Sequence, residues 1–146
     1  MSTASVAVAP VSAGARSLLA AARRGLTEAE LARTATERYA AAHLAALRAA
    51  AAVLAARARP ATSAARRGRP LSVWTLLAGV APEMGEWAEF FAAGARKRAL
   101  AEAGLPGSVT TREADDLLRD ATTFLAAVET KLGVLRQPPL SAVRRL

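Results

Sequence analysis

Apolar residues recur every three or four positions along most of the chain, and this spacing predicts amphipathic helices. The clearest stripe consists of Leu44, Leu47, Ala51 and Leu54. No segment alternates apolar and polar residues in the manner of a half-buried β-strand. The pattern therefore predicts an all-α fold.

Helix-capping signals divide the first half of this pattern into two helices. The first is predicted over Ala13–Arg24, because Gly25 can end a helix in a left-handed conformation. The second is predicted over Thr27–Arg57. It opens on a capping box completed by Glu30, and no glycine or proline interrupts it before Pro60. About 31 residues at ~1.5 Å each give a rod of roughly 46 Å.

The second half of the chain predicts three further helices. Ser72 can cap a short helix over residues 73–80. A longer helix is predicted over Glu83–Ala103 and ends at Gly104. A second capping box opens the last helix, predicted over residues 110–132, with a further glycine beyond it.

These elements predict a mostly antiparallel bundle of four main helices plus a short one, built around the long helix. Residues 13–133 are expected to form this bundle, with a mobile basic linker over residues 60–70 inside it. Residues 1–12 and 134–146 are expected to be a disordered leader and a disordered tail, because they lack a helical apolar pattern.

Composition narrows the possible functions. The chain has no cysteine, which excludes disulfides, thiolate metal sites and cysteine nucleophiles and fits a cytoplasmic protein. The 53% hydrophobic content is largely alanine, and aromatic residues make up only 4%. The apolar run over residues 40–56 is interrupted by His43 and Arg48, and it lacks the roughly 20 strongly apolar residues of a membrane span. We therefore expect no membrane partner.

Positive charge is concentrated in the first half of the chain. The formal net charge is +8, and residues 1–70 carry eleven arginines against three glutamates. Six arginines form a block that no acidic residue interrupts, namely Arg48, Arg57, Arg59, Arg66, Arg67 and Arg69. Such a block can attract the phosphate groups of RNA. A solvated basic loop in an arginine-rich chain is the alternative interpretation.

Candidate chemistry centres on His43, the one histidine of the chain. Histidine can serve as an acid or a base near neutral pH. Tyr39 lies one helical turn earlier on the same face. The alternative is a histidine packed between helices and hydrogen-bonded to Tyr39 or to a backbone carbonyl. We expect neither a cofactor nor a metal site. Asp116 and Asp120 share a helix face, but acids near a helix start have a simpler electrostatic explanation.

Four stretches of the sequence resemble a small actinobacterial family of HEPN-domain proteins. They are residues 38–51, 72–77, 82–91 and 112–121. The resemblance implies a helical bundle that forms a homodimer and serves RNA or nucleotide chemistry. Active HEPN domains cleave RNA without a metal and carry an arginine four to six residues before a histidine. Arg38-x4-His43 has this spacing.

By that resemblance, Arg38 would stabilise the scissile phosphate and His43 would move protons, with Tyr39 in support. The chain departs from the family pattern at two points. Tyr39 follows the arginine where the family usually has a polar residue such as Asn, Asp or His, and the motif lies in the second helix where the family usually has it in a later one. Two functions therefore remain open. The first is RNA or nucleotide binding with possible metal-independent RNA cleavage. The second is a non-catalytic interaction or regulatory module that partners a nucleic-acid enzyme.

Overall fold

The computed structural model describes residues 11–57 and 72–134, and these residues form helices without any strand. The helices are α1 (Ala13–Leu31), α2 (Ala35–Arg57), α4 (Val73–Val80), α5 (Gly85–Ala93), α6 (Ala95–Glu102) and α7 (Thr111–Lys131), with a short 3-10 helix, η2 (Pro82–Met84). The predicted all-α helical bundle is confirmed.

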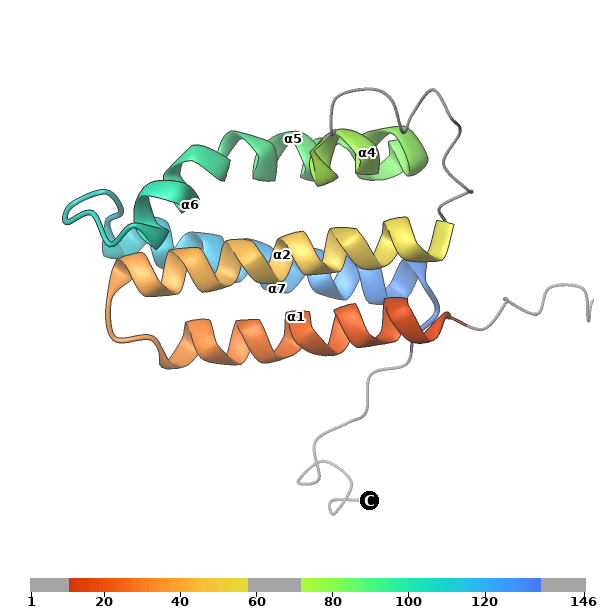
Figure 1. Ribbon diagram of the computed structural model, residues 1–146, viewed down its shortest axis with the longest axis horizontal. Helices are drawn as coiled ribbons and strands as arrows, with labels where there is room; N and C mark the ends of the chain where they lie inside the picture. The colour runs from red at the N-terminus through yellow and green to blue at the C-terminus, as the bar shows by residue number, and fades with distance from the viewer. Residues whose placement is uncertain (1–10, 58–71, 135–146) are drawn as a thin grey trace, which may run out of the picture.

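The helices form a layered bundle around α2 (Figure 1). The segments α4, α5 and α6 follow one another along one side of the molecule, and α1 lies on the opposite side. Helix α2 is the longest, with 23 residues, and it packs against α1, α7, α4 and α6. It takes the central position that the sequence predicts for the long helix.

The predicted bounds of the long helix are wrong, because the chain turns at residues 32–34. Helix α1 continues through Gly25 to Leu31, and α2 begins only at Ala35. Thr27 does not cap a helix, since its hydroxyl donates to the carbonyl of Arg23 at 3.3 Å. The capping hydroxyl belongs to Thr34, which accepts the backbone N–H of Glu37 at 3.1 Å. This connection makes α1 and α2 an antiparallel pair.

Gly25 permits close packing of α1 on α2 instead of ending α1. It is buried, and a Cβ atom at this position would lie 3.2 Å from the Cβ of Ala45. Both facing surfaces consist mainly of alanine, which lets the helix axes approach closely. The fully buried alanines include Ala15, Ala22, Ala29, Ala42, Ala49 and Ala50.

The helix predicted over residues 83–103 is divided in two at Gly94. Helix α5 ends at Ala93 and α6 begins at Ala95. A Cβ atom on Gly94 would lie 2.8 Å from the hydroxyl oxygen of Tyr39, so a larger residue at this position would displace the tyrosine side chain. The break therefore lies where the chain passes Tyr39.

Other local predictions are confirmed. Ser72 caps α4 by accepting the backbone N–H of Thr75 at 3.1 Å. Thr110 and Glu113 form both hydrogen bonds of the predicted capping box at the start of α7. Gly104 and Gly133 both follow helix ends with φ of 69°.

The large side chains of the core gather between α2, α4, α5 and α7. Phe91, Phe124 and Leu77 are fully buried there. The ring centroids of Phe91 and Phe124 are 5.1 Å apart, and Trp74 lies 5.1 Å from Phe91. Phe90, the neighbour of Phe91 in the sequence, is 46% exposed and lies outside this core.

Helix α2 is long and apolar enough to cross a membrane by length and composition alone. Half of that apolar window is buried by the other helices of the bundle, which is common for a core helix. The expectation of no membrane partner stays a prediction. The predicted disorder of the leader and tail, and of the linker over residues 60–70, falls almost wholly outside the described residues.

Candidate functional site

His43 lies in the centre of the bundle, with no solvent-exposed surface. Its ring stacks on Tyr39, with centroids 6.4 Å apart, and meets Trp74 and Phe91 edge-on, each at 6.0 Å. Nε2 lies 2.8 Å from the backbone oxygen of Phe91. A carbonyl oxygen can only accept, so Nε2 carries the proton and donates it. This hydrogen bond agrees with the alternative interpretation of the sequence, in which His43 packs between helices and binds a backbone carbonyl.

Burial lowers the pKa of His43 below its ordinary value of 6.5, and the neighbouring Arg98 lowers it further. The hydrogen bond to the Phe91 carbonyl acts in the opposite direction. Nδ1 is buried and has no hydrogen-bond partner among the described residues. Protonation of Nδ1 would therefore place a positive charge in the core, where no hydrogen-bond acceptor among the described residues would stabilise it. His43 is accordingly neutral at pH 7.

Arg38 lies on a different side of α2 and binds the end of α1. Its guanidinium donates to the backbone oxygens of Ala29 at 3.0 Å, Ala32 at 3.1 Å and Glu30 at 3.4 Å. It also donates to Asp115 of α7 at 2.6 Å. The last carbonyls of a helix have no partner within the helix, so Arg38 caps α1 and ties it to α7. Arg38 and His43 therefore have no hydrogen-bond partner in common.

Tyr39 connects the centre of the bundle to a surface cavity. It is 6% exposed, and it lines a cavity of about 340 Å³ together with Lys97 and Glu113, which form an ion pair. Burial raises the pKa of Tyr39 above its ordinary value of 10.0; the charge of Lys97 lowers it and that of Glu113 raises it. The tyrosine is therefore neutral at physiological pH and cannot act as a base there.

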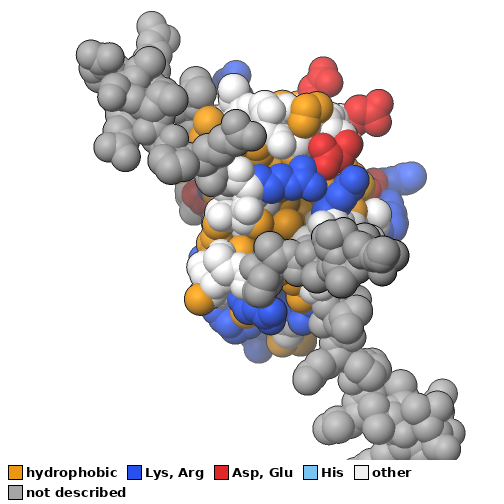
Figure 2. Space-filling model, turned by 90° about the vertical axis from the view of Figure 1, so that its right-hand side faces the viewer, with side chains coloured by type: hydrophobic (Ala, Val, Ile, Leu, Met, Phe, Trp, Pro, Cys, Tyr) orange, Lys and Arg blue, Asp and Glu red, His pale blue; other side chains and the backbone are white. Residues whose placement is uncertain are grey.

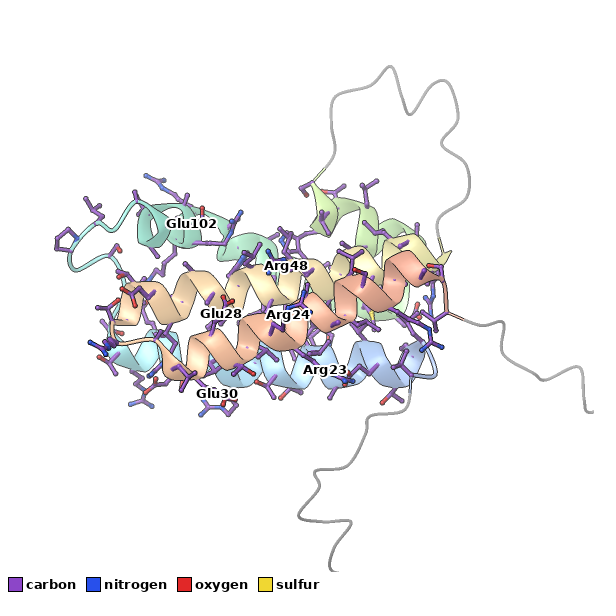
Figure 3. The ribbon with its side chains drawn as sticks, turned by 60° about the horizontal axis from the view of Figure 1, so that its bottom comes forward. Arg23, Arg24, Glu28, Glu30, Arg48 and Glu102 are labelled. Carbon is purple, nitrogen blue, oxygen red and sulfur yellow. The ribbon has the colours of Figure 1, made fainter. Side chains whose placement is uncertain are left out.

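The predicted nucleic-acid residues are only partly within the described residues. Arg57 forms an ion pair with Glu83 at 2.7 Å, and Arg48 is half-buried on α2. Figure 3 shows Arg48 on the face formed by α1 and α2, where Arg24 and Glu28 of α1 also lie. The remaining members of the block, Arg59, Arg66, Arg67 and Arg69, lie outside the described residues.

The acids considered for metal binding have other neighbours. Asp115 binds Arg38, and Asp116 binds Arg119 at 2.6 Å. Over residues 11–57 and 72–134, no three His, Cys, Asp or Glu side chains gather in a way that could hold a metal ion. Asp120 lines a surface groove instead of joining Asp116 in a metal site.

Substitution of Arg38 by alanine is expected to lower the free energy of unfolding by about 1–3 kcal/mol, because it removes the cap of α1. Urea unfolding followed by circular dichroism measures this change. Arg33→Ala is the matched control, since Arg33 is exposed on the neighbouring turn and makes no side-chain hydrogen bond within the described part of the chain. Equal stability of the two variants would contradict the capping role.

The comparisons with known proteins agree with this fold. The sequence model of the HEPN_SAV_6107 family, a family of HEPN-like domains, matches residues 29–129. No curated protein and no solved structure matches the chain significantly. The family match extends from the end of α1 to the end of α7 and includes every helix around His43. The chain therefore belongs to this family of HEPN-like domains, and it is a nucleotide- or RNA-related module.

Proposed function

We propose that this protein is a non-catalytic HEPN module, which binds a partner protein of a nucleic-acid system and does not itself cleave RNA. The burial of His43 supports this proposal most strongly, since the chain's one histidine has no exposed surface and its Nε2 proton is held by the Phe91 carbonyl. A general base must come within hydrogen-bond reach of the 2′-hydroxyl that it deprotonates. RNA has no access to His43 in this fold.

The environment of Arg38 supports the same proposal. Transition-state stabilisation requires a guanidinium that is free to meet the developing charge on the phosphate. Arg38 instead donates to three backbone carbonyls and to Asp115. The catalytic role that the HEPN resemblance implies for Arg38 and His43 stays a prediction, and the homodimer and the cytoplasmic location stay predictions as well.

Partly exposed apolar side chains offer a surface for a protein partner. Several large apolar side chains are at least partly open to solvent on α2, α4 and α5, where a protein partner could cover them. They include Leu44, Leu54, Leu76, Val80 and Phe90.

RNA binding without cleavage is a second candidate function. The net charge of +8, with Arg24 and Arg48 on one face of the bundle, favours it. Phosphate contacts make RNA affinity fall steeply with salt. A titration of single-stranded RNA at several salt concentrations therefore tests this function separately from cleavage.

We expect single-stranded RNA to stay intact when it is incubated with the full chain at high micromolar concentration in EDTA. Gel electrophoresis should give an RNA half-life within about twofold of the half-life in buffer alone, since the buried His43 cannot reach the RNA as a general base. Tyr39→Phe, which retains the ring packing, serves as a folded comparison. Cleavage by the wild-type chain that both Arg38→Ala and His43→Ala abolish, while both variants stay folded, would refute the non-catalytic proposal.

A further inference from the structure

A continuous groove runs along α7, where that helix meets η2, α5 and the start of α6. Its middle part is a cavity of about 380 Å³ lined by Glu83, Glu86, Trp87, Phe90 and Asp120. A second cavity of about 400 Å³ shares Glu83 and Trp87 with it, and the cavity beside Tyr39 shares Phe90 and Asp120. The three cavities therefore form one surface feature, here called the acidic groove.

The middle of the acidic groove combines unpaired carboxylates with aromatic rings. Glu86 and Asp120 have no ion-pair partner among the described residues. Glu83, in contrast, binds Arg57 at 2.7 Å and lies 3.7 Å from Lys131. At the η2 end of the bundle, acidic side chains gather on one side of the surface (Figure 2). A ligand that enters here meets net negative charge.

The aromatic lining selects for a cation with an apolar stem. Phe90 is 46% exposed and Trp87 is half-buried, and their ring centroids are 6.5 Å apart in an edge-on arrangement. A guanidinium can stack on such rings while it donates hydrogen bonds to a carboxylate. Arginine suits this combination better than lysine, because its flat, weakly hydrated head can do both at once. At the edge of the groove, Arg57 already donates a hydrogen bond of this kind to the carboxylate of Glu83, at 2.7 Å.

The length of the acidic groove indicates an extended peptide. Its α7 wall begins at Glu113, and the stretch considered for a peptide follows α7 from Asp116 to Lys131. At ~1.5 Å per helical residue, this stretch measures roughly 22 Å, which an extended strand of about seven residues spans. Nucleic acid is disfavoured as the occupant, because unpaired carboxylates repel phosphate groups.

We propose that the acidic groove is the docking site for an arginine-rich peptide segment of the partner protein. This inference rests on the proposed function, an interaction module, and it names the chemistry of the partner. One arginine of the segment lies over Phe90 between Glu86 and Asp120. Neighbouring apolar side chains of the segment contact Trp87 and the alanines of α7, Ala126 and Ala127.

Fluorescence anisotropy of a labelled seven-residue peptide with three arginines and two leucines tests this proposal on the full chain. The double variant Glu86→Gln/Asp120→Asn is expected to weaken peptide binding by about tenfold or more, because it removes two charge-assisted contacts. Phe90→Ala should also weaken binding, by about fivefold. A peptide with glutamate in place of each arginine should not bind.

The matched control is Glu28→Gln/Glu30→Gln, which changes the net charge equally at two exposed acids of α1, neither of which lines the acidic groove. Its peptide affinity should stay within about twofold of the wild type. The inference is overturned if the two double variants weaken binding equally, or if the arginine peptide does not bind at millimolar concentration. RNA cleavage in EDTA is measured separately, so cleavage with intact peptide binding would refute only the non-catalytic function.

Discussion

Replacement of Phe124 by alanine is expected to lower the free energy of unfolding by about 3–5 kcal/mol. Phe124 is fully buried on α7, and its ring lies 5.1 Å from Phe91, 5.4 Å from Trp87 and 6.1 Å from Trp74. It therefore joins α7 to both α4 and α5. The truncation would remove these ring contacts and leave a cavity that rigid aromatic neighbours fill poorly. Urea unfolding at pH 7.5, followed by far-ultraviolet circular dichroism, measures the loss.

Phe90→Ala is the control for this measurement, because it makes the same chemical change at a side chain that is 46% exposed. Its cost should stay below about 1 kcal/mol, since solvent fills the space that the ring leaves. If Phe90→Ala destabilised the chain as much as Phe124→Ala, Phe124 would not be the buried centre of the aromatic core.

His43→Ala is expected to lower the free energy of unfolding by about 2–4 kcal/mol at pH 7.5. The variant loses the hydrogen bond to the Phe91 carbonyl and opens a cavity between Tyr39 and Trp74. Phe91 keeps one partner, because its oxygen also accepts the N–H of Gly94 at 3.0 Å. The loss should therefore arise mainly from packing. Urea unfolding of the two proteins side by side gives the difference.

The same variant should also change how stability depends on pH. The pKa of His43 is lowered in the folded chain, so the unfolded chain takes up the proton first as the pH falls. The stability of the wild type is therefore complete above about pH 6.5 and declines below it, by at most ~1.4 kcal/mol per pH unit. His43→Ala should show no such decline between pH 7.5 and 5.5, because His43 is the chain's one histidine. A wild-type curve that is flat over this range would mean that His43 is accessible to solvent.

The helix starts were predicted well where a capping residue lies three positions before its partner. Ser72 and Thr110 are examples, and both accept the backbone N–H that the sequence indicates. Thr27 has the same spacing to Glu30 and was predicted to open a helix, but α1 continues through it. Thr34 competes with Thr27, because Glu37 stands three residues after it and the chain turns there. Capping boxes can be recognised in a sequence. Where two lie close together, the sequence alone does not tell which of them begins the helix.

Burial along α2 does not follow the size of its apolar side chains. The stripe of Leu44, Leu47, Ala51 and Leu54 is half-buried. The fully enclosed alanines of this part of α2 are Ala45, Ala46, Ala49, Ala50 and Ala52. Hydrophobicity alone ranks leucine as the better core residue. Helix α2 is covered by α1 at close range, and such a contact requires small side chains.

By itself, the sequence determined the all-α class, most of the helices and the residues that cap them, because these depend on hydrogen bonds and periodicity within a few positions of the chain. Only the tertiary structure decided where α1 ends, that Arg38 caps it with help from Asp115, and that Phe90 faces solvent while Phe91 is buried. It also decided the environment of His43, whose hydrogen-bond partner lies 48 residues away. These outcomes depend on contacts between distant segments, which no local pattern records.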